Sequence, residues 1–201
     1  MSKRSFRRRT GNRRYKRLFV IATEGKRTEP EYFQMLNTLC TDKDERTVQV
    51  KCLKGHGNSP RQVLSRMKKH LRREGLKSSD EAWLVVDKDQ WSPSDLDKLF
   101  QWSQSSQNYG LAVSNPCFEQ WLLLHFEDCR CMSAYECIRR LCRHLPDYDK
   151  TIEPDRLVPG IQSAIQRAKR IDRPPCVDWP RSAGSTNVYR LVEKLLGHLP
   201  S

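Results

Sequence analysis

The sequence predicts an α/β fold: a mainly parallel four-stranded sheet with helices on both faces, followed by a helical C-terminal part. Four short apolar segments alternate along the chain with segments whose apolar residues recur at helical spacing. Strands that alternate with helices favour a parallel sheet that is covered on both faces. A length of 201 residues suits one domain with an elaboration and is enough to bury a core.

The predicted strands are short apolar segments that stop at polar or turn residues. The first, RLFVIATEG, stops at Glu24 and Gly25, and the third, AWLVVDKD, stops at Asp87 and Asp89. The second, TVQVKCL, alternates apolar and polar residues, and the fourth, GLAVSN, is short. These segments span residues 17–25, 47–53, 82–89 and 110–115.

Capping sequences predict where the helices between these strands begin and end. Thr28 and Glu31 have the spacing of a capping box, at the start of a helix over residues 28–40. Gly75 is expected to end the second helix. A serine or asparagine followed by proline is expected to begin the other helices, at Ser59-Pro60, Ser92-Pro93 and Asn115-Pro116.

The last third of the chain is predicted to be helical and to pack on the α/β core. The loop over residues 173–187 is rich in Pro, Gly and Ser, and Ser185 or Thr186 is expected to cap the final helix. We expect helices over residues 133–145, 160–171 and 188–197. The predicted organisation is therefore a flexible basic tail over residues 1–17, a core over residues 18–128 and a helical part over residues 129–201.

Charge is distributed unevenly along the chain. The formal net charge is +13, and the first 17 residues contribute nine Lys or Arg and no acid. A basic tail of this kind contacts phosphates or remains solvated. We therefore expect nucleic acid as a partner, contacted in the tail by Arg7, Arg8, Arg9, Arg13 and Arg14.

The sequence also sets expectations about the cellular compartment. No stretch approaches the roughly 18 apolar residues of a membrane span, and the N-terminus lacks the apolar segment of a signal peptide. The eight cysteines are scattered without a CxxC pair, as is usual for reduced thiols. We expect a cytoplasmic protein that makes no membrane contact.

Three carboxylates follow predicted strands and point to a metal site. Residues i and i+2 of an extended strand face the same side, roughly 6.5–7 Å apart, so Asp87 and Asp89 could hold one cation or bridge two. Glu24 ends another strand, and parallel strands bring their carboxyl ends to one edge of the sheet. Carboxylates with water and substrate phosphate suit Mg²⁺ or Mn²⁺. The alternative is that these acids are hydrated strand ends or first-turn acids that favour a helix dipole.

Neighbouring residues extend this predicted site. Lys26 and Arg27 are expected to contact phosphate and to offset developing negative charge. Glu119 lies in the first turn of a predicted helix, where it could join the metal ligands or act only as a surface acid. His125 is expected to be a satisfied, partly buried histidine, and His56 has no assigned role.

Three motifs carry a resemblance to a known family. The segments ATEGKRTEPEYF, VVDKDQW and SNPCFEQWLLLHF together resemble the RloB family, and the later DYDK and GSTNVYRLVEKL are also similar to it. The family is linked to bacterial anti-phage loci and resembles the Toprim fold of topoisomerases, primases and some nucleases. The resemblance implies a Toprim/Rossmann-like fold, with the Toprim acids at Glu24, Asp87 and Asp89.

The resemblance and the placement of the acids together predict a function. We expect a Mg²⁺-dependent nuclease that hydrolyses phosphodiesters in RNA, such as tRNA, or in DNA, as an effector of anti-phage defence. Glu24 would transfer a proton or bind metal, Asp87 and Asp89 would bind metal, and Glu119 would assist. The resemblance also implies an ATPase partner. The sequence neither predicts nor excludes a homo-oligomer. Two alternatives remain: a nucleic-acid-binding or scaffold module with an idle site, and a phosphohydrolase of small molecules.

Overall fold

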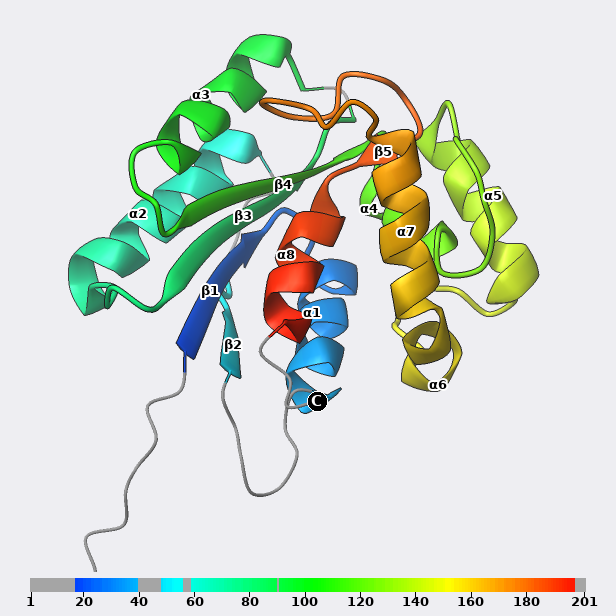
Figure 1. Cartoon of the computed structure of the whole chain (residues 1–201), viewed down its shortest axis with the longest axis horizontal. Coiled ribbons are helices and arrows are strands. Elements are labelled where there is room, and N and C mark those ends of the chain that lie inside the picture. Colours follow the sequence, from blue (N-terminus) through cyan, green and yellow to red (C-terminus); the bar gives the residue numbers. More distant parts are fainter. Residues whose placement is uncertain (1–16, 40–47, 56–58, 90, 198–201) are drawn as a thin grey trace, which may run out of the picture.

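The computed structural model describes residues 17–39, 48–55, 59–89 and 91–197. In these residues a five-stranded sheet in the order β2-β1-β3-β4-β5 lies between two groups of helices (Figure 1). The strands are β1 (Arg17–Thr23), β2 (Val48–Cys52), β3 (Glu81–Asp87), β4 (Tyr109–Asn115) and β5 (Ser185–Thr186). The first four strands are parallel, as the alternation of strands and helices predicted.

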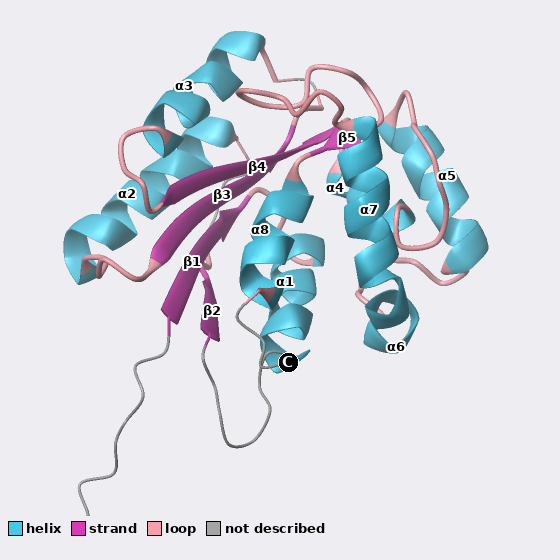
Figure 2. Cartoon of the chain, viewed as in Figure 1, coloured by secondary structure: helices cyan, strands magenta, loops and turns pink. Residues whose placement is uncertain are grey.

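The predicted number of strands was wrong, because the sheet has a fifth strand. Ser185 and Thr186 pair antiparallel with the end of β4, at Asn115 and Ser114. The two-residue strand has no periodicity of its own and lies in a loop rich in turn residues, so no sequence pattern distinguishes it. It joins the C-terminal part of the chain to the sheet, and Figure 2 shows it as the short strand β5 beside the end of β4.

One face of the sheet packs against helices α2 (Pro60–Glu74) and α3 (Pro93–Ser103). These helices lie together on one side of the sheet in Figure 1. Alternate strand residues such as Val20, Leu84 and Val113 form a buried core with Val63 of α2 and Leu96 of α3. Burial of apolar residues on alternate strand positions is what fixes the register of the strands on this face.

The other face packs against α1 (Thr28–Leu39), α4 (Phe118–Leu123) and the C-terminal helices. Phe19, Ile21 and Val85 of the sheet share this core with Trp121 of α4 and Leu191 of the last helix. The C-terminal helices are α5 (Ala134–His144), α6 (Pro154–Leu157), the 3₁₀ turn Val158–Gly160, α7 (Ile161–Ile171) and α8 (Val188–Leu196). The C-terminal part therefore completes the core of the domain.

None of the helices in the described ranges is long and apolar enough to cross a membrane.

Two predicted N-caps and the predicted C-terminal end of α2 were correct. Ser59 accepts a hydrogen bond from the backbone N–H of Gln62 in a full capping box, and Ser92 accepts one from Asp95 N. Gly75 ends α2 with φ = 71°, in the left-handed region that glycine tolerates.

Three predicted helix caps were wrong, because other segments occupy the capping groups. The Thr28 hydroxyl donates to Lys150 O, and Glu31 Oε2 accepts from Ile152 N, so these two residues form no capping box. The Asn115 side chain donates to Pro180 O and Arg181 O, and α4 begins later, at Phe118. The N-cap position of the last helix is Asn187, since Ser185 and Thr186 belong to β5. The Thr186 hydroxyl nevertheless accepts from the N–H of Val188, the first residue of α8, over 3.3 Å.

Candidate functional site: an acidic cavity at the carboxyl edge of the sheet

A cavity of about 410 Å³ lies where β1, β3 and β4 end. Its position is the edge at which parallel α/β sheets bind ligands. It lies at the ends of the neighbouring strands β1 and β3. The helices that follow these two strands cover opposite faces of the sheet: α1 leads from β1 to β2, and α3 leads from β3 to β4. The lining residues are Glu24, Gly25, Lys26, Arg27, Thr28, Glu29, Asp87, Asp89, Phe118, Glu119 and Lys150.

Glu24 is held between the ends of β1 and β3. Its backbone N–H donates to Val85 O over 2.9 Å, so the residue after β1 still pairs with β3. Its carboxylate accepts from Asp87 N at 3.2 Å and from Trp91 Nε1 at 2.9 Å. Burial raises the pKa of Glu24 to about 7, despite the opposing effect of these two hydrogen bonds. A carboxyl group with a pKa near neutrality is suited to exchange protons at physiological pH.

The two aspartates line the same cavity, but they do not continue one strand as predicted. The strand β3 ends at Asp87, and Asp89 has φ = 30°, outside extended geometry. Asp89 N donates to Pro116 O, which turns the chain and leaves the Asp89 side chain exposed while Asp87 is half-buried. Burial and the nearby acid Glu29 raise the pKa of Asp87 well above its usual value.

Glu29 is a site residue that the sequence analysis missed. It is only 4% exposed, and its Oε1 accepts the Gly25 backbone N–H at 2.7 Å. Burial is the main cause that raises its pKa, and Glu119 adds to the effect. A signal was present, because Glu29 precedes Tyr32 and Phe33 by three and four residues and so shares the buried face of α1.

Glu119 lines the cavity as predicted, and a second missed residue orients it. Glu119 is 7% exposed, and Tyr148 OH donates to its Oε1 at 3.0 Å. The same hydroxyl lies 3.4 Å from Thr28 Oγ1. Tyr148 belongs to the DYDK segment between α5 and α6, and nothing in its local pattern indicated a contact with the first helix of the core.

Three cations border the acids. Lys26 and Arg27 line the cavity, as expected for groups that contact phosphate, and Lys150 joins them from the C-terminal part. Arg27 also forms exposed ion pairs with Glu31 and Asp149, both at 3.3 Å. Five carboxyl groups thus line the cavity beside three cations, and the raised pKa values of Glu24, Glu29 and Asp87 show that burial opposes the full ionisation of these acids.

Other predicted residues lie outside this cavity or outside the described residues. His125 is buried, contacts Tyr32 OH and Trp121 O at 3.1 Å each, and has its pKa lowered by burial to about 4. It is therefore a neutral core residue, more deeply buried than expected. His56 and the tail residues Arg7, Arg8, Arg9, Arg13 and Arg14 lie outside the described residues.

The comparison with known families assigns the chain. The family described as RloB-like protein matches residues 19–195, which include all the described strands and helices except the start of β1 and the end of α8, and all the cavity residues. The chain belongs to the RloB-like protein family. No curated protein and no solved structure gives a significant match to this RloB-like protein.

The acids of this RloB-like protein fit a hard divalent cation by their chemistry. The pKa values of Glu24, Glu29 and Asp87 are raised because these carboxyl groups are buried close to one another. A divalent cation bound there would stabilise their charged forms. Within the described ranges, no three His, Cys, Asp or Glu side chains are already arranged to hold a metal ion. Mg²⁺ needs no such cage, because it is commonly held by one or two carboxylates, several waters and substrate phosphate.

Proposed function

We propose that this RloB-like protein is a metal-dependent nuclease that hydrolyses phosphodiester bonds in RNA or DNA. One observation carries the proposal: five carboxylates from β1, α1, β3 and α4 converge on one cavity that three cations border. Carboxylates of this kind hold Mg²⁺ or Mn²⁺, and basic side chains beside them suit a polyanionic substrate.

The side chains suggest a division of roles. Asp87 and Asp89 would hold the cation, with Glu119 and Glu29 placed to support it. When bound, Mg²⁺ supplies charge stabilisation to a phosphate and lowers the pKa of water. Glu24, with a pKa of about 7 and a carboxylate fixed by two hydrogen bonds, would accept or return a proton.

The cations would bind the substrate backbone. Lys26 is exposed, lines the cavity and has no carboxylate partner among the described residues, so its ammonium group is available for a phosphate oxygen. Lys150 lines the cavity from the segment between α5 and α6, and its charge acts to lower the pKa of Glu29 against the larger effect of burial. Arg27 would contribute less, because it already shares its charge with Glu31 and Asp149.

The biological setting is proposed on the resemblance to RloB proteins. We propose that this chain is a cytoplasmic effector of anti-phage defence that acts with an ATPase partner. The basic tail would add salt-dependent affinity for nucleic acid through the phosphate backbone.

Cleavage of mixed tRNA, single-stranded RNA and plasmid DNA with Mg²⁺ or Mn²⁺ tests the proposal. The wild type should cleave at least one of these substrates, and EDTA should abolish cleavage. Glu24→Gln keeps the size of the side chain and one acceptor oxygen, but it replaces the other oxygen with an amide group and removes proton exchange. This change should reduce the rate by roughly 10²–10⁴-fold.

The double change Asp87→Asn with Asp89→Asn should also abolish cleavage, while Asp97→Asn on α3 is a matched control outside the cavity. Cleavage that survives both site variants would contradict the proposal. Nucleic-acid binding without cleavage by any form, with the ATPase partner present, would instead support a binding module with an idle site.

A further inference from the structure

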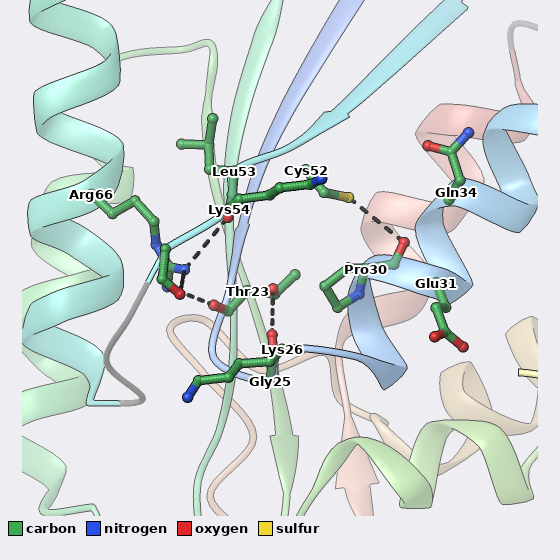
Figure 3. A pocket seen from close by; sticks show the side chains of 11 residues that line it. Thr23, Gly25, Lys26, Pro30, Glu31, Gln34, Cys52, Leu53, Lys54 and Arg66 are labelled. Atoms are coloured by element: carbon green, nitrogen blue, oxygen red, sulfur yellow. Dashed lines mark hydrogen bonds between the residues drawn. The ribbon is translucent and has the colours of Figure 1, made fainter. Parts of the chain in front are cut away.

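A second cavity of about 580 Å³ adjoins the acidic one, and no part of the proposed chemistry uses it. It lies between the ends of β1 and β2, with α1 on one side and α2 on the other (Figure 3). Gly25 and Lys26 line both cavities, so one short segment separates them. The volume is within the range of small-molecule pockets, roughly 300–1,000 Å³.

The walls of this cavity are largely apolar. Pro30, Cys52 and Leu53 contribute to them, and Cys52 Sγ lies 3.8 Å from Pro30 O, which joins the end of β2 to α1. Burial raises the pKa of the Cys52 thiol to about 12, so the sulfur is neutral at physiological pH. Such walls suit a flat, weakly polar group rather than an ion.

The rim of the cavity is cationic, in contrast to the acidic cavity beside it. Lys26 and Lys54 are exposed at the rim, and Arg66 extends from α2 over the wall in Figure 3. The Glu31 carboxylate also lines this cavity, but it accepts from Ile152 N at 3.0 Å and pairs with Arg27. The rim therefore has more positive than negative charge.

Arg66 is fixed in place by three hydrogen bonds to backbone carbonyl groups. Its Nη2 donates to Thr23 O at 2.8 Å, and its Nη1 donates to Leu53 O and Gly55 O at 3.4 Å. Its Nε is buried without a hydrogen-bond partner among the described residues. A Cβ at Gly55 would lie 2.9 Å from Arg66 Cδ, so glycine allows the guanidinium to lie against the loop.

We propose that this cavity binds one nucleotide of the nucleic-acid substrate, next to the phosphodiester that the acidic cavity receives. The proposal rests on the proposed nuclease function and assigns the neighbouring subsite. The base and sugar would lie against Pro30 and Leu53, and the attached phosphate would contact Lys54 at the rim. Lys26, which borders both cavities, would contact the scissile phosphate that links this nucleotide to the next one.

The exposed side chain of Gln34 gives the subsite a means to distinguish bases. It lines the cavity from α1, and its carboxamide carries both a donor and an acceptor. A carboxamide can pair with the edge of a base through two hydrogen bonds. We therefore expect cleavage to prefer certain bases on one side of the cut and Gln34→Ala to weaken that preference.

Binding of nucleoside 5′-monophosphates to the full chain, measured by isothermal titration calorimetry in EDTA, tests the subsite. At least one of the four should bind at least tenfold more tightly than ribose 5-phosphate or inorganic phosphate. Lys54→Ala should weaken that binding about fivefold. Lys51→Ala is the matched control, because Lys51 is exposed on the same strand β2 but does not line the cavity.

The outcomes separate this inference from the nuclease proposal. Glu24→Gln should bind the monophosphate as well as the wild type does, although it should not cleave. Equal binding of ribose 5-phosphate, or equal effects of Lys54→Ala and Lys51→Ala, would overturn the nucleotide subsite even if cleavage is observed. Nucleotide binding that depends on Lys54, in a protein that cleaves nothing with any metal, would support the subsite and overturn the nuclease.

Discussion

The backbone N–H of Asp87 donates to Glu24 Oε2 over 3.2 Å and so joins the end of β3 to the residue that follows β1. The opposite connection, from Glu24 N to Val85 O, is 2.9 Å long. Trp91 Nε1 occupies the second carboxylate oxygen of Glu24 at 2.9 Å. The orientation of this carboxyl group is thus set by the sheet, while burial brings its pKa to about 7.

Trp91→Phe should make Glu24 harder to ionise. The indole N–H stabilises the charged carboxylate, so its loss raises the pKa of Glu24 above 7. The acid limb of the pH–rate profile for nucleic-acid cleavage should move to higher pH by about one unit. Trp102→Phe, on the face of the sheet covered by α2 and α3, is the control that should leave the profile unchanged.

The stability of the metal-free protein should fall as the pH rises from about 4.5 to about 7. The pKa of Glu24 is raised from 4.5 to about 7 in the folded state, so the folded chain holds a proton that the unfolded chain has released. The pKa values of Glu29 and Asp87 are raised as well and act in the same direction. Thermal unfolding in EDTA across this range measures the effect, and Glu24→Gln should flatten the dependence.

Addition of Mg²⁺ at pH 7.5 should reverse part of this loss. A cation that binds only the folded protein stabilises it by about 2.7 kcal/mol at one hundred times its dissociation constant. This corresponds to an increase in Tm of roughly 5–10 °C for a domain of this size. An unchanged Tm in wild-type protein, or an equal increase in the double Asp87→Asn, Asp89→Asn variant, would argue against a cation at these acids.

Tyr148→Phe should release the carboxylate of Glu119. The hydroxyl donates to Glu119 Oε1 at 3.0 Å, and its removal leaves a nearly buried acid with one donor fewer. We expect a loss of about 1–3 kcal/mol in the free energy of unfolding together with slower cleavage. Tyr135→Phe is the matched control, because Tyr135 is 76% exposed on α5 and should have no effect.

Gly25→Ala should disturb the site through Glu29. A Cβ at position 25 would lie 1.9 Å from Glu29 Oε2, so the carboxylate would have to move and lose its hydrogen bond to Gly25 N. We expect a loss of about 1–3 kcal/mol in the free energy of unfolding. In a double-mutant cycle the cost should largely disappear in the Glu29→Ala background, and additive costs would show that another contact is responsible.

Deletion of residues 1–16 should weaken nucleic-acid binding mainly at low salt. The deletion removes Arg7, Arg8, Arg9, Arg13 and Arg14 but retains Arg17, whose guanidinium pairs with the buried Glu81 at the start of β3. Each lost phosphate contact should reduce the slope of log affinity against log salt by about 0.7 for a single strand. An unchanged slope would mean that the tail does not contact the nucleic acid.

From the sequence alone, the parallel arrangement of the first four strands and the edge at which the acids gather could be predicted. Glu24 and Asp87 each follow an apolar strand, and Glu119 follows a fourth, so topology alone brings them together. Such information is local: it depends on periodicity, turn residues and the rule that crossover connections keep strands parallel.

Which other groups complete the cavity, and how burial shifts their pKa values, depends on contacts that form only in the folded chain. Lys150 lines the cavity and Tyr148 contacts Glu119 because the C-terminal part packs over α1, and β5 forms because Ser185 and Thr186 meet the end of β4. Asp89 likewise leaves extended geometry through a hydrogen bond to Pro116. The physical reason is that contacts between distant segments and the burial that raises the pKa of Glu24 depend on the whole fold, which no short stretch of sequence encodes.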